Sequence, residues 1–85
     1  MASQNINREV LIDTILTSTD YEDKQGFFFH TTVGGAIKYL PKLNGDSETI
    51  TKTFEASDIY NNCVEARKIF KTDTAATGIY VGKGV

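Results

Sequence analysis

The sequence predicts an all-β protein, a small antiparallel β-sandwich or barrel of about six strands. Three observations favour this fold class. Short segments with apolar residues at alternate positions recur along the chain, turn-forming residues separate them, and no stretch keeps a helical period over the length of an ordinary helix. Residues 1–85 form a single domain, because so short a chain has room for one hydrophobic core.

The N-terminal region leaves two alternatives open. Residues 1–7 are polar and lack periodicity, so we expect a flexible arm or one that a partner orders. In residues 6–18 the apolar side chains alternate with polar ones as in a strand, but they also fit one face of a short helix. β-branched residues such as Val10 and Ile12 favour the strand. The charged residues 19–25 are expected to form a solvated connection.

Three consecutive phenylalanines follow Gly26. Because successive side chains of a strand point to opposite faces, at least one ring lies on the face opposite its neighbours. That face needs a cover, which a second sheet, an N-terminal helix or a partner chain would provide. We expect most aromatic side chains to lie in the core, and a partner interface to form at Phe27, Phe28, Phe29 and Tyr80.

Asn44-Gly45 predicts a hairpin, because a type I′ turn needs positive φ at both central residues. It would join a strand over 36–40, closed by Pro41, to a strand over 48–55. In the second of these strands the threonines share one face, which we expect to be solvated.

The C-terminal part predicts a strand over 63–71, a loop of small and polar residues, and a final strand. Val64, Ala66 and Phe70 share one parity in the first strand, and apolar residues alternate again in the last. This is the period of half-buried strands. No residue pattern in this unit points to chemistry.

Charge and composition exclude several classes of protein. A net charge of −2, a pI near 5.2 and scattered basic residues argue against nucleic-acid binding, which needs clustered lysines and arginines. No apolar run approaches the roughly 20 residues of a membrane span, and the N-terminus has no secretory pattern. The single cysteine, Cys63, excludes an intrachain disulfide and fits a reducing compartment.

No combination of side chains predicts a catalytic or metal site. His30 is the single histidine, and Cys63 fits a small buried residue better than a nucleophile. Asp20, Glu22 and Asp23 lack the spacing, the glycine and the closing glutamate of a calcium loop. We therefore expect no enzyme activity, no metal, no cofactor and no small-molecule substrate.

From about residue 35 to the end, the chain carries a series of segments: GGAIKYLP, the threonine-rich ETITKTF, VEARKIFKTDT and the ending AATGIYV. This series resembles small bacteriophage virion proteins of the capsid-associated, head-fibre and tail spike-base types. It differs from them in Asp73, where related sequences tend to have glycine, and in a longer loop through 58–62.

The resemblance implies a structural component of a phage particle that docks on other virion proteins. A capsid decoration or head-fibre component is the first expectation, and a tail or spike adaptor the next. Such a protein would be made in the host cytoplasm, reside in the virion and form a homo-oligomer. One alternative is a small regulatory or inhibitory protein-binding module that acts through the edge at 27–29. The other alternative is a small enzyme that uses His30 together with an acidic side chain.

Overall fold

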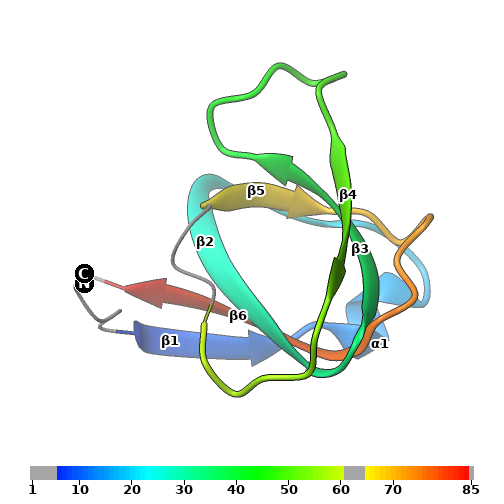
Figure 1. The fold of residues 1–85 in the computed structure, drawn as a ribbon. Helices are drawn as coiled ribbons and strands as arrows, with labels where there is room; N and C mark the ends of the chain where they lie inside the picture. The colour runs from blue at the N-terminus through cyan, green and yellow to red at the C-terminus, as the bar shows by residue number, and fades with distance from the viewer. Residues whose placement is uncertain (1–5, 61–64, 85) are drawn as a thin grey trace.

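The computed structural model describes residues 6–60 and 65–84, which form a rolled antiparallel sheet (Figure 1). The strand order is β1-β6-β2-β5-β3-β4. The elements are β1 (Ile6–Leu11), α1 (Asp13–Leu16), β2 (Tyr21–Val33), β3 (Gly35–Pro41), β4 (Ile50–Phe54), β5 (Ala66–Ile69) and β6 (Thr77–Gly84). The predicted all-β class is confirmed. No helix among these residues has the length and apolar character needed to cross a membrane.

The long strand β2 joins the two halves of the sheet. Its beginning pairs with β5, from Tyr21 opposite Ile69, and its end pairs with β6, from Phe28 onward. Between these parts the register shifts and Gly26 has a φ of +94°, a conformation that favours glycine. The strand can therefore bend there and serve both halves.

The expected connection over 19–25 is wrong in its greater part, because β2 begins at Tyr21. The charges in this region misled the prediction. Glu22 and Lys24 are exposed, whereas the Tyr21 ring packs on Phe27 with ring centroids 5.1 Å apart. The segment is therefore a strand, and so few of its residues are apolar that the alternation is hard to see in the sequence.

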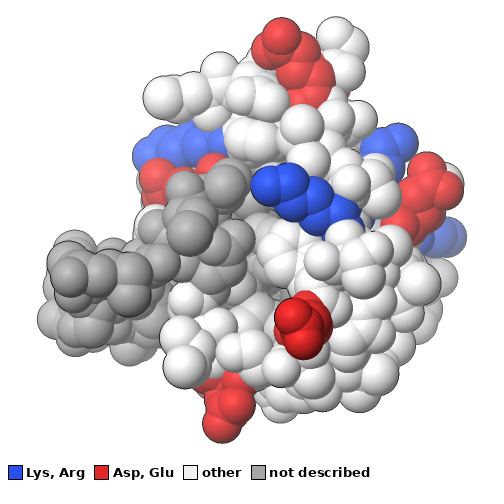
Figure 2. All heavy atoms as spheres, viewed as in Figure 1, with Lys and Arg blue, Asp and Glu red and all other residues white. Residues whose placement is uncertain are grey.

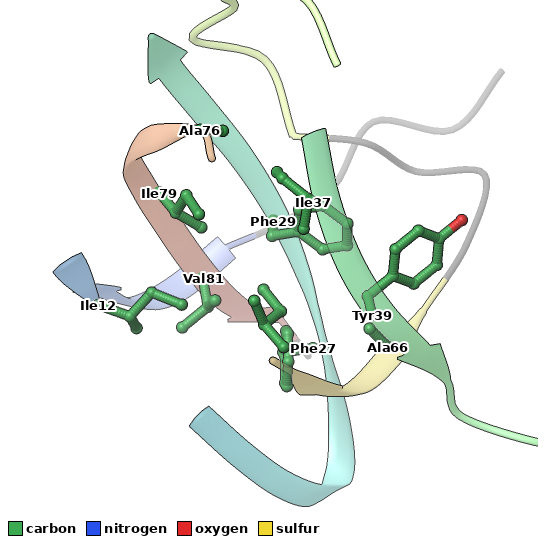
Figure 3. Close-up of a cluster of buried hydrophobic side chains, with 10 residues drawn as sticks. Ile12, Phe27, Phe29, Ile37, Tyr39, Ala66, Ala76, Ile79 and Val81 are labelled. Carbon is green, nitrogen blue, oxygen red and sulfur yellow. The ribbon is translucent and has the colours of Figure 1, made fainter. Parts of the chain in front are cut away.

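The core is an apolar cluster to which nearly every strand contributes (Figure 3). Phe27 and Phe29 are fully buried in it, and the Phe29 ring contacts the rings of Tyr39 and Phe54 at centroid distances of 5.5 and 5.3 Å. The other buried members are Ile12, Ile37, Ala66, Ile69, Ala76, Ile79 and Val81. The expected alternation of apolar residues in the last strand is thus confirmed.

Near the N-terminus the two alternatives, strand and short helix, both occur, one after the other along the chain. β1 ends at Leu11, and the single-turn helix α1 follows. Ile6 and Asn7, which were expected to belong to the arm, are part of β1, where Ile6 pairs with Gly84. The rest of the expected arm, residues 1–5, lies outside the described residues, as do Cys63 and Val64.

The expected type I′ turn at Asn44-Gly45 is wrong, although β3 and β4 do form the predicted hairpin. Pairing stops at Tyr39 opposite Ile50, and neither Asn44 nor Gly45 has a positive φ. Glu48 explains the longer loop. Its carboxylate accepts from the Gly45 backbone N–H at 2.7 Å, and its carbonyl accepts from the Asn44 side-chain amide at 2.9 Å.

The burial of β5 also differs from the expected alternation. Ala66 and Ile69 are buried, whereas the pattern grouped Ala66 with Phe70, which is half-buried. The cause is a β-bulge: consecutive residues of β3 pair with Lys68 and Ala66, so Arg67 has no partner in that register. Because of this extra residue, Ala66 and Ile69, three positions apart, both point to the core.

An ion pair between β2 and β6 gives a pH-dependent contribution to stability. Lys83 Nζ donates to Asp23 Oδ2 at 2.9 Å, and this bond lowers the pKa of Asp23 below its usual value of 3.8. Stability from this pair is present above that value and is lost as the pH falls through the lowered pKa.

We therefore expect the wild-type free energy of unfolding to fall more steeply below about pH 4 than that of Asp23→Asn, which cannot ionise. Urea titrations of both proteins between about pH 2 and pH 6 measure the difference. Parallel pH profiles would show that the ion pair contributes nothing.

Candidate docking face

The outer side of the β1-β6-β2 region carries a group of aromatic and polar side chains. Two rows of paired residues define it, because residues that are paired across strands share a face. One row is Leu11, Tyr80 and His30, and the other is Glu9, Gly82 and Phe28. Their neighbours in sequence, among them Phe29 and Val81, point to the core. We call Glu9, Leu11, Phe28, His30 and Tyr80, together with Tyr60 lying across them, the docking face.

His30 is the centre of this face. Its ring stacks on Tyr80 at 5.2 Å with an interplanar angle of 8°, and meets Tyr60 edge-on at 4.6 Å. Its Nδ1–H donates to the Ser57 carbonyl oxygen at 2.6 Å, which fixes the tautomer because a carbonyl can only accept. The His30 side chain is only 7% exposed. The imidazole is thus held rigidly between two tyrosines.

Tyr60 fastens the segment after β4 to β1. Its hydroxyl donates to Glu9 Oε2, while Ser57 N–H donates to the Thr31 carbonyl oxygen at 2.8 Å. Burial, followed by the hydrogen bond to Glu9 and the charge of that residue, raises the pKa of the Tyr60 phenol. The phenol therefore stays protonated as a donor, and the segment is tied down at two points.

The two ring nitrogens of His30 have different surroundings. Nδ1 donates to a backbone carbonyl, whereas Nε2 lies 3.9 Å from Glu9 Oε2, beyond hydrogen-bond distance. Among the described residues no three His, Cys, Asp or Glu side chains gather as a metal site would require.

The predicted interface residues separate into two pairs. Phe28 and Tyr80 lie on the docking face, on neighbouring strands, and the expectation for them stays a prediction. For Phe27 and Phe29 it is wrong, because both side chains are 0% exposed in the core and have no surface to offer. The alternation of β2 separates the three rings.

Comparison with known proteins gives no further guide to this face. No protein-family model, curated protein or solved structure matches the chain. The role of this face is therefore inferred from its geometry and from the pattern of residues 35–85.

Sequence reasoning missed four members of the docking face, namely Glu9, Leu11, His30 and Tyr60. The alternation of Glu9 and Leu11 with Val10 and Ile12 was a usable signal, because it places the first two opposite the core once β1 is accepted as a strand. Nothing local connects Tyr60 to Glu9, which is 51 residues away in the chain. That contact can be recognised only once the tertiary structure is known.

Proposed function

We propose that this chain is a structural component of a bacteriophage particle and docks on other virion proteins through the docking face. A capsid decoration or head-fibre role is the first choice, and a tail or spike adaptor the second. The observation that carries the proposal is the apolar area that Phe28 and Leu11 keep, around the stacked His30 and Tyr80 pair, on the outside of a sheet whose inner side is already filled.

The chemistry of the face suits protein contacts. Aromatic side chains are enriched in the centres of protein interfaces. Phe28 is half-buried and Leu11 is 47% exposed, so both retain apolar area for a partner. Because hydrogen bonds and stacking already restrain His30 and Tyr60, little side-chain freedom would be lost on binding. A rigid aromatic surface is what a permanent docking contact needs.

The distribution of charge agrees with a protein partner. Acidic and basic side chains are interspersed on the viewed surface (Figure 2). Several pair with each other, namely Lys38 with Asp73, Lys42 with Glu65, Arg67 with Asp46, Lys68 with Asp20 and Lys83 with Asp23. Such pairing leaves little local excess of positive charge to attract phosphates.

Phe28→Ser is the variant that tests the face. We expect it to lower binding to purified particles by about 30-fold or more, because interface hot spots contribute at least about 2 kcal/mol. Its thermal midpoint should stay close to that of the wild type, since Phe28 lies outside the core cluster. Co-sedimentation with particles that lack the protein measures binding, and circular dichroism measures folding.

Val33→Ser is the matched control. Val33 is an exposed apolar residue of the same strand, β2, at 55%. It lies an odd number of positions from Phe28, so its side chain points to the other face of the sheet. It should bind normally. If Phe28→Ser binds as well as Val33→Ser, the docking face is not the contact. If Phe28→Ser instead loses binding to a host protein and the wild type ignores particles, the regulatory module replaces the virion role.

A further inference from the structure

A leucine stands almost fully in solvent at the tip of the loop between β3 and β4. Leu43 is 94% exposed, the highest value among the exposed large apolar residues. The loop around it is held firmly: Asn44 N–H donates to the Pro41 carbonyl at 3.1 Å, and Arg67 Nη2 donates to the Asn44 carbonyl at 2.8 Å. Leu43 is therefore displayed on a restrained loop, which is how an anchor residue is pre-organised.

A pocket of about 260 Å³ lies between α1 and the connection from β5 to β6. Its apolar walls come from Leu16, Ala75 and Ala76, and Lys71 lies at its exposed side. The remaining lining residues are Asp13, Thr17, Thr74 and Thr77. The pocket thus combines a small apolar wall with one exposed positive charge.

The pocket is large enough to take a leucine side chain. A void left by a buried leucine is on the order of 150 Å³, so one leucine side chain fits into the pocket with room for its neighbours. Leu16, Ala75 and Ala76 would supply apolar contacts on its sides.

The charges also match. Glu48 in the loop is exposed and Lys71 at the pocket is exposed, and neither makes an ion pair with another described residue within 4.0 Å. Opposite charges at the rim would favour the encounter and fix its orientation.

The two features cannot meet within one chain. The loop lies at the top of the molecule in Figure 1, whereas α1 and the β5–β6 connection lie at the lower right. A contact between them must link two copies, and because the surfaces differ it joins the copies head to tail.

We propose that Leu43 of one copy inserts into the pocket at Leu16, Ala75 and Ala76 of a second copy. This self-association goes beyond the proposed docking, since it uses a different surface. Head-to-tail contacts form a ring if the rotation closes and a filament if it does not. A single leucine makes a weak contact, so association appears at high protein concentration or when a particle holds the copies close together.

Sedimentation velocity of the purified chain from micromolar to millimolar concentration tests the proposal. The wild type should shift progressively toward larger species. Leu43→Ser, which loses the anchor, and Ala75→Phe, which fills the pocket, should each remain monomeric. Ile59→Ser is the matched control, because Ile59 is also an exposed apolar residue, at 79%, and should associate like the wild type.

Mixing the two defective variants gives the sharpest result. Leu43→Ser keeps the pocket and Ala75→Phe keeps the leucine, so the mixture should form a dimer with one copy of each and nothing larger. A charge reversal adds a second measurement: Lys71→Glu should weaken association, because it places a negative charge at the pocket opposite Glu48.

A wild type that stays monomeric at millimolar concentration would overturn the proposal, as would wild-type association of Leu43→Ser or a mixture that fails to dimerise while both variants are folded. Particle binding separates this outcome from failure of the proposed function. Leu43→Ser should still bind particles through the docking face, and Phe28→Ser should still self-associate.

Discussion

Phe29→Ala is expected to remove a large part of the domain's free energy of unfolding. The ring is 0% exposed and lies between Tyr39 and Phe54, so its removal opens a cavity that the neighbouring rings cannot refill. Truncating a buried phenylalanine costs about 3–5 kcal/mol, and small domains have only about 5–15 kcal/mol in total. Urea titration followed by near-ultraviolet circular dichroism measures the loss.

Phe28→Ala is the control for this prediction. It removes the same atoms from the adjacent position, but Phe28 lies on the outer face and is only half-buried. We expect it to cost less than half as much as Phe29→Ala. Equal losses at the two positions would contradict the assignment of Phe29 to the core and Phe28 to the docking face.

Asp13→Ala should be the most destabilising change outside the apolar core, at about 3 kcal/mol. The Asp13 carboxylate accepts from the backbone N–H groups of Gly78 and Ile79 at 2.8 and 3.0 Å. It thereby ties α1 to the start of β6. Hydrogen bonds to a charged group contribute about 1.5–3 kcal/mol, and alanine would leave both donors without an acceptor.

Asp13→Asn keeps one carbonyl oxygen at the same place, so it should recover part of the loss. The free energy of unfolding from urea titration, compared among the wild type and the two variants, measures this order. Surface substitutions without structural consequence change stability by less than about 0.5 kcal/mol. If Asp13→Ala lowers the free energy of unfolding by no more than this, the contact with β6 does not hold α1 in place.

The parts of the fold that could be predicted are those set by local alternation. Phe27 to Phe29 had to divide between two faces, and Ile79 and Val81 had to share one, because strand geometry alone requires it. The same rule separates the core rings from Phe28. The hairpin between β3 and β4 could also be predicted from the sequence, but the conformation of its turn could not.

The failures come from features that break alternation or act over long distances in the chain. The bulge at Arg67 reverses parity, and a bulge depends on the strands that flank it. The loop at Asn44-Gly45 is a local exception, because hydrogen bonds with Glu48 hold a loop longer than a two-residue turn.

The contacts that anchor the site are harder still to predict. Asp13 bonds residues that follow it by 65 and 66 positions, and Tyr60 bonds Glu9 across the sheet. Periodicity contains no information about such partners, because they become neighbours only when distant segments come together in the fold.

Quantitative mass spectrometry of purified phage particles tests the central claim most directly, using the phage whose genome encodes the chain. The proposed virion role predicts that peptides of this chain copurify with the particle in fixed ratio to the other structural proteins, through density gradients and salt washes. Abundant peptides in the infected-cell lysate, together with none in the washed particle, would contradict it.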